Sequence, residues 1–136
     1  MRLPVFYKGG YLMTIREAIE EIDVLRKGNQ IPENMKMRWL SMLDTRAHNE
    51  IFSQHVPIPE RFSGYDIATS WDQELLIPFP YDEVYGLYLC MKIDEAEKES
   101  LHYNISAEKF NRAYQAFMDR YNKTHKPVYG GAGFYF

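Results

Sequence analysis

The stretch from Leu75 to Met91, which reads LLIPFPYDEVYGLYLCM, constrains the fold more than any other part of the chain. Pro80 suits the first position of a helix because its missing N–H would have no partner there. Asp82 and Glu83 would then lie in the first turn, where the helix dipole favours carboxylates. The following residues, 84–91, are almost all apolar. A helix that is apolar on every face must be covered on all sides, by its own domain or by another subunit.

Composition narrows the class of protein. A chain of 136 residues is long enough for one domain with a substantial core. The net charge of −3 argues against a protein whose main task is to grip phosphate backbones, because that task needs a positive face. Cys90 has no second cysteine to pair with and lies among apolar residues, which predicts a core side chain in a reducing compartment. No run approaches the roughly 20 apolar residues of a membrane span, so we expect no membrane partner.

Capping and spacing signals predict two helices ahead of the apolar stretch. Thr14 and Glu17 form a capping box that begins the first helix, and Gly28 ends it. The second helix begins with Pro32 at its first position and ends near His55. The predicted core stripes are Ile15, Ile19, Ile22 and Leu25 in the first helix, and Met35, Trp39, Met42, Leu43, Ala47 and Ile51 in the second.

A fourth helix is predicted after the helix that Pro80 opens. The composition changes after Met91 to KIDEAEKES, so the far end of the third helix should stand in solvent. A break across residues 102–106 separates it from the fourth helix, which ends before Pro127. The core stripe of that helix comprises Phe110, Ala113, Tyr114, Phe117 and Tyr121. The chain is therefore predicted to be mainly α, with one helical domain over residues 14–126.

Two segments outside the helices carry apolar residues. Residues 56–79 form a long proline-rich connector, and its apolar side chains should lie against the helices. Residues 127–136 are rich in glycine and aromatic residues. We expect this extended C-terminal arm to lie on its own domain or on a neighbour, because an apolar segment is costly to leave in water.

The N-terminal residues 1–13 have two interpretations. Lys8-Gly9-Gly10 can be encoded by a bacterial ribosome-binding sequence a few codons ahead of Met13, which makes these residues an over-called start. Alternatively they form an arm with two short strands, residues 5–7 and 11–13, around a Lys-Gly-Gly turn.

The second helix carries the best candidates for metal chemistry. Asp44 and His48 lie four residues apart, and His55 follows two turns later. A metal site needs a third ligand at close range, and Glu50 lies off that face. An Asp–His pair on a solvated face is the favoured interpretation, and a nuclease or metalloenzyme is the weakest hypothesis. We expect no enzymatic activity, no catalytic or metal-binding residues and no cofactor.

Two further patterns are candidates for contact surfaces. Tyr81, Tyr85 and Tyr88 have helical spacing and could stack bases, but no cation stands among them, so core or subunit packing is favoured. The acidic run is interpreted as a solvated helix end that could line a channel; it comprises Asp94, Glu95, Glu97 and Glu99.

Two stretches resemble a family of small proteins encoded in the morphogenesis modules of tailed phages and prophages of Gram-positive bacteria. The first reads Asp72-x-Glu74-Leu75-Leu76-Ile77-Pro78-x-Pro80-Tyr81-Asp82-x-x-Tyr85-x-x-Tyr88. The second reads Tyr103-Asn104, then Phe110-Asn111-x-Ala113-Tyr114-x-x-Phe117-x-x-x-Tyr121-Asn122-x-Thr124-His125-x-Pro127. The opening Met13-Thr14-Ile15-Arg16-Glu17-Ala18 is similar too, so the resemblance spans most of residues 13–127.

The resemblance implies a head–tail connector, also called an adaptor or head-completion protein. It implies a four-helix adaptor-type bundle that docks as a ring, commonly of twelve copies, beneath the portal protein and around the DNA channel. The partners would be the portal, the next neck or tail-completion protein, and passing double-stranded DNA without sequence-specific contact. The expected location is the neck of the virion, after assembly in the bacterial cytoplasm. The expected subunit or partner interface comprises Tyr81, Tyr85, Tyr88, Val128, Tyr129, Phe134, Tyr135 and Phe136.

A second hypothesis comes from a different class. The chain could be a small helical regulatory binding module, of phage origin or antitoxin-like, that acts through an aromatic surface at Tyr81, Tyr85 and Tyr88. Portal-dependent assembly would favour the adaptor, and a monomer that is indifferent to portal would favour the module.

Overall fold

The computed structural model describes residues 11–128, and this part of the chain is mainly α, with four α-helices and no β-strand. The helices are α1 (Ile15–Leu25), α2 (Glu33–Glu50), α3 (Glu83–Ala96) and α4 (Ser100–Thr124). A short 3-10 helix, η1 (Phe52–Gln54), follows α2. Residues 1–10 and 129–136 lie outside the described part, and with them the predicted strand at residues 5–7.

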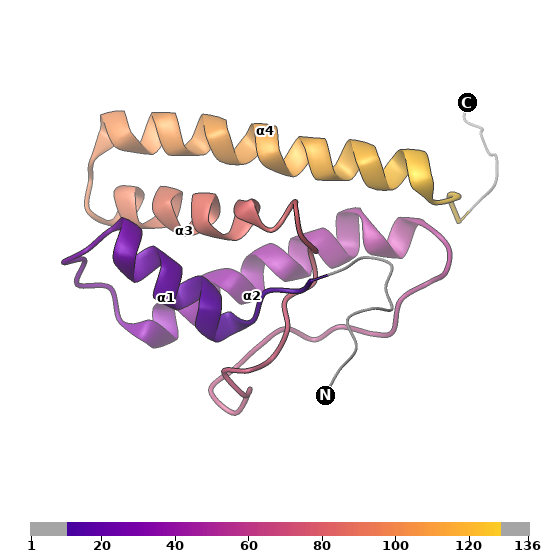
Figure 1. Ribbon diagram of the computed structural model, residues 1–136, viewed down its shortest axis with the longest axis horizontal. Helices are drawn as coiled ribbons and strands as arrows, with labels where there is room; N and C mark the ends of the chain where they lie inside the picture. Colours follow the sequence, from indigo (N-terminus) through magenta and orange to yellow (C-terminus); the bar gives the residue numbers. More distant parts are fainter. Residues whose placement is uncertain (1–10, 129–136) are drawn as a thin grey trace.

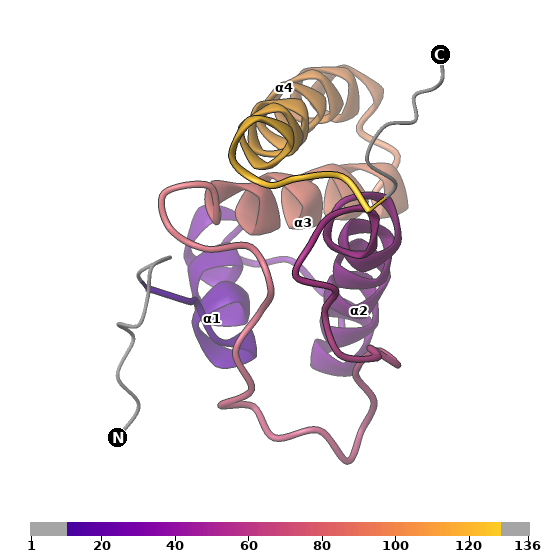
Figure 2. The ribbon, with the colours of Figure 1, turned by 90° about the vertical axis from the view of Figure 1, so that its right-hand side faces the viewer.

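The apolar helix α3 lies in the middle of the fold. Figure 1 shows α4 running along α3 in the opposite direction, and Figure 2 shows α1 and α2 side by side on the other side of α3. Its side chains at Val84, Tyr85, Leu89 and Ile93 are fully buried. The helix is therefore covered by its own chain, as a helix that is apolar on every face requires.

Helix α1 begins as predicted and ends earlier. The Thr14 hydroxyl accepts a hydrogen bond from the Glu17 N–H at 3.1 Å, and the Glu17 carboxylate accepts one from the Thr14 N–H at 3.0 Å. This capping box is confirmed. Leu25 is 54% exposed and not part of the core stripe, because it lies at the rim of the contact, beside Gly86 of α3.

Helix α2 and the residue after it bury four of the six predicted core residues, namely Trp39, Leu43, Ala47 and Ile51. Met37 and Leu40 lie in the core together with Trp39. Met35 and Met42 are exposed, and they share the opposite face because they lie seven residues apart. Pro32 is the cap of this helix and not its first residue.

The boundary between α3 and α4 also corrects the prediction. Helix α3 begins at Glu83 and not at Pro80, and α4 begins at Ser100 without a break across residues 102–106. The turn between them is short because Lys98 adopts a positive φ of 60°, and the Glu99 N–H bonds back to the carbonyl oxygen of Asp94 at 2.9 Å.

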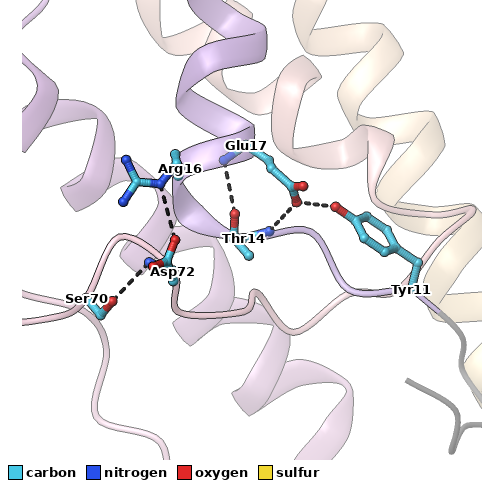
Figure 3. Close-up of polar contacts among 6 residues, drawn as sticks. All are labelled: Tyr11, Thr14, Arg16, Glu17, Ser70 and Asp72. Atoms are coloured by element: carbon cyan, nitrogen blue, oxygen red, sulfur yellow. Dashed lines mark hydrogen bonds and ion pairs between the residues drawn. The ribbon is translucent and has the colours of Figure 1, made fainter. Parts of the chain in front are cut away.

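Residues 71–79 anchor the connector to the start of α1. Two N–H groups of the first turn of α1 have no partner within the helix and donate to the connector instead. The Ile15 N–H donates to the Gln73 carbonyl at 3.0 Å, and the Arg16 N–H donates to the Trp71 carbonyl at 2.9 Å. Figure 3 shows the side chains around this junction, including the ion pair between Arg16 and Asp72. Tyr11 also lies here, and its hydroxyl bonds to the Glu17 carboxylate.

Residues 11–13, predicted as the second strand of the N-terminal arm, form no strand, but their backbone accepts hydrogen bonds from the connector. The N–H of Leu75 donates to the Met13 carbonyl at 2.7 Å, and the N–H of Phe79 donates to the Tyr11 carbonyl at 2.9 Å. Leu75 and Ile77 are buried as expected for a connector laid against the helices. Ile67 is 92% exposed, so this expectation is wrong for the middle of the connector, which loops away from the helices (Figure 2).

Candidate functional site

Asp44 is the central polar group of the core. Its carboxylate is fully buried and accepts three hydrogen bonds: from the Tyr85 hydroxyl at 2.6 Å, from the Tyr65 hydroxyl at 2.5 Å and from the Leu76 N–H at 3.1 Å. The Tyr85 hydroxyl in turn accepts from the Ile77 N–H at 2.8 Å. The interpretation of Asp44 as part of a solvated Asp–His pair is therefore wrong.

The environment of Asp44 changes its acidity. Burial raises the pKa of Asp44 to about 6, although the bonds from Tyr65, Tyr85 and Leu76 favour the charged form and oppose this shift. Burial also raises the pKa of Tyr85, and the Asp44 charge adds to that effect. The arrangement joins α2, the connector and α3 at one carboxylate, which is a structural role.

His48 holds the connector against the end of α2. Its Nε2 lies 3.0 Å from the carbonyl oxygen of Glu60, which can only accept, so Nε2 carries the proton. Its Nδ1 lies 3.2 Å from the Ser53 hydroxyl oxygen, and its ring packs on Phe62 with 5.7 Å between centroids. Both ring nitrogens are engaged within the chain.

The three candidates for metal chemistry do not converge. His55 is buried, and its Nδ1 donates to the Ile51 carbonyl at 2.7 Å. Asp44 and His48 are engaged as described above. Within residues 11–128, no group of three His, Cys, Asp or Glu side chains is placed to hold a metal ion.

A hollow of about 350 Å³ lies between the C-terminal end of α2 and the connector. Its lining is mostly apolar and comprises Phe52, Pro59, Phe62 and Leu76, with His48, Glu60 and Arg61. The bonds from His48 to Glu60 and Ser53 hold two sides of this hollow together. Sequence reasoning missed it because its walls come from segments that approach only in the folded chain.

The C-terminal end of the described chain pairs with the segment after α2. The Val56 N–H donates to the Lys126 carbonyl at 2.9 Å, and the Val128 N–H donates to the Gln54 carbonyl at 3.0 Å. Beside this pairing the His125 ring stacks on Tyr121 with 3.7 Å between centroids. His125 is also the C-terminal cap residue of α4. Val128 is half-buried in this pairing.

The tyrosines of the expected interface belong to the core. Tyr85 is fully buried, and Tyr88 packs on Phe110 with 5.1 Å between centroids. Tyr81 is half-buried against Phe117. The interface expected at Tyr85 and Tyr88 is thus corrected, because both side chains fill the space between α3 and its neighbours. The remaining members of that set, Tyr129, Phe134, Tyr135 and Phe136, lie outside the described residues.

The acidic run divides into one buried and three exposed carboxylates. Asp94 is buried, pairs with Arg26 of α1 at 3.1 Å and accepts from the Ser106 hydroxyl of α4 at 2.9 Å. The expectation of a solvated, channel-lining Asp94 is therefore wrong. Glu95, Glu97 and Glu99 are exposed at the end of α3.

Cys90 is buried as predicted, and burial raises the pKa of its thiol.

Large apolar side chains are exposed on several elements of the described chain, including Met35 and Met42 of α2. At the end of the fold that Arg26, Asp94 and Ser106 hold together, α1 and α4 present Val24, Leu25, Leu101 and Ile105. The connector presents Ile58, Ile67 and Phe79.

No protein-family model matches the chain, and neither a curated protein nor a solved structure shows significant similarity to it. Among residues 11–128, none of the helices has the length and apolar character that crossing a membrane requires.

Proposed function

We propose that the chain is a structural protein of the phage neck, a head–tail connector whose subunits form a ring beneath the portal and join the capsid to the tail. The resemblance of residues 13–127 to the connector family motivates this proposal. In this proposal the four helices are an adaptor-type bundle, and the proline-rich segment 56–79 is part of its docking surface. The protein then acts by binding its neighbours and catalyses no reaction.

The observation that carries the proposal is the exposure of large apolar side chains on a chain whose core is already filled. Val24 is 77% exposed and Leu101 is 71% exposed at one end of the fold, and Ile67 is almost fully exposed on the connector. A closed ring needs two different faces that match each other, because each subunit contacts its neighbours head to tail. In this proposal the apolar side chains at the end of α1 and the start of α4 belong to one face, and Ile58, Ile67 and Phe79 belong to the other.

The charge distribution supports a place around DNA. Glu97 and Glu99 stand exposed at the turn between α3 and α4 on either side of the exposed Lys98, and Glu95 pairs with Lys92 at 3.4 Å. A wall of this sign would repel the phosphate backbone and let DNA pass without sticking. The residues considered for metal chemistry support a structural role as well. Asp44 and His48 form hydrogen bonds with residues 60–76 of the connector and hold it against α2.

Assembly with portal rings tests the proposal. We expect the purified chain to be small in solution and to form a ring when portal rings are added, as measured by size-exclusion chromatography with mass determination and by electron microscopy. The double variant Leu101→Ser/Ile105→Ser should reduce ring formation at least tenfold. Lys109→Ser, an exposed substitution on the same helix, should leave it unchanged.

The outcome that would contradict the proposal is a chain that stays monomeric and ignores portal at high concentration. The regulatory binding module would then be the better hypothesis. No observation favours that module at present, because two of the three tyrosines on which it depends, Tyr85 and Tyr88, are buried.

A further inference from the structure

The chain leaves the described structure beside the hollow at the end of α2. Residues 126–128 run antiparallel to residues 54–56, through the two backbone bonds that Val56 and Val128 donate. At Val128 this pairing directs the described chain from Val56 toward Gln54, which is two residues from Phe52. Figure 2 shows residues 125–128 passing over the end of α2. Phe52 is one wall of the hollow.

The sequence beyond Val128 has the length to enter the hollow. Residues 129–133 read YGGAG, and five extended residues span at most about 17 Å. Their three glycines permit sharp changes of direction. Because Phe52 is only two residues from Gln54, the partner of Val128, the aromatic residues 134–136 come within reach.

The chemistry of the hollow suits aromatic side chains. Its volume of about 350 Å³ lies at the low end of the range of small-molecule sites, ~300–1,000 Å³, and fits one or two rings. Phe52 and Phe62 line the hollow, and each ring also packs within the chain, Phe52 on Phe117 and Tyr121 and Phe62 on His48 and Tyr65. Arg61 at the rim offers a guanidinium that can lie over a further ring. The segment 134–136 reads Phe-Tyr-Phe and carries no charged side chain.

We propose that the hollow is the docking site for the C-terminal aromatic segment, residues 134–136, of the same chain. The isolated subunit then stores its aromatic end against the end of α2 and the connector. This inference concerns the free chain and does not depend on the proposed neck function, so either can fail alone.

Disulfide trapping tests the docking directly. In a Cys90→Ala background, the pair Arg61→Cys/Tyr135→Cys places one thiol at the rim of the hollow and one in the segment. The matched control is Arg38→Cys/Tyr135→Cys. Arg38 is exposed and lies about three turns before the C-terminal end of α2, and therefore away from the hollow. We expect the Arg61 pair to close within one chain at least tenfold faster than the control pair at micromolar protein, as seen on non-reducing gels.

Equal rates for the two pairs would overturn the proposal. A disulfide that forms mainly between two chains would overturn it as well, and would assign the hollow to a neighbouring copy. If a cysteine variant loses its helical circular dichroism, amide hydrogen exchange of the full chain replaces the disulfide experiment. Exchange in the peptide 56–62 should then rise at least threefold in Phe134→Ala/Tyr135→Ala/Phe136→Ala, and unchanged exchange there contradicts the docking.

Discussion

The hydroxyl of Tyr85 in α3 donates to the Asp44 carboxylate in α2 across 2.6 Å, with both groups fully buried. The same hydroxyl accepts the N–H of Ile77, so one oxygen joins two helices and the connector. This contact determines where the connector crosses the core.

Tyr85→Phe should destabilise the fold by about 1–3 kcal/mol, because it leaves the buried Ile77 N–H without a partner and removes one donor from Asp44. Urea unfolding followed by circular dichroism measures this change. Tyr88→Phe is the matched control on the same helix, since Tyr88 contributes its ring to Phe110 and should cost less than half as much. Equal losses in the two variants would contradict the role of the Tyr85 hydroxyl.

Asp44 should make the stability of the chain depend on pH. The folded-state pKa of about 6 lies above the ordinary value of 3.8, so the folded state binds the proton more tightly than the unfolded state. The stability from this proton is fully present below about pH 3.8 and is lost as the pH rises through about 6. The unfolding free energy of the wild type, minus that of Asp44→Asn, should therefore fall by up to about 3 kcal/mol between pH 4 and 7. A difference that stays flat over this range would refute the assignment.

The ion pair between Arg26 and Asp94 should contribute more than ion pairs on the surface. Asp94 is buried, whereas the Arg26 side chain is 34% exposed, so water screens part of the interaction. Arg26→Met should therefore lower the free energy of unfolding by about 1–3 kcal/mol, which is less than the loss of a fully buried partner. Arg112→Met removes an exposed i,i+4 pair with Glu108 and should cost about 0–1 kcal/mol. Thermal unfolding of both variants checks the order. A larger loss from Arg112→Met would show that the buried carboxylate is held in another way.

Two glycines with the same backbone angle should respond differently to substitution. Gly28 and Gly64 both have a φ of +88°, which costs an alanine about 1–2 kcal/mol. A Cβ at Gly28 meets open space, whereas a Cβ at Gly64 would lie 2.7 Å from the Ser41 hydroxyl, which accepts the Tyr65 N–H. Gly64→Ala should therefore destabilise the chain more than Gly28→Ala in the same unfolding assay. The double variant Gly64→Ala/Ser41→Ala should not recover the stability, because the Tyr65 N–H then loses its acceptor.

Local signals predicted the helices well and their partners poorly. The capping box at Thr14 could be recognised from four consecutive residues, because both of its bonds lie within one turn. The core role of Asp44 could not, because its partner Tyr65 arrives from 21 residues away along an irregular segment. Asp94 was placed in solvent for the same reason, since the Arg26 that neutralises it lies 68 residues earlier.

The boundaries followed the same division. Ser106 has poor helix propensity and stands near the expected break, yet its hydroxyl satisfies the buried Asp94 and α4 continues through it. The hollow at the end of α2 had no sequence signal, because Phe52 and Phe62 reach it from different segments. Tertiary contacts therefore decided the placement of Asp44, Asp94 and the hollow.

The pairing of residues 126–128 with residues 54–56 joins the end of α4 to the segment after α2. A pull on the C-terminal end is shared between the long outer helix and the helix that leads into η1, instead of peeling one helix away from the rest. A force applied at this end therefore reaches the core through both helices at the same time.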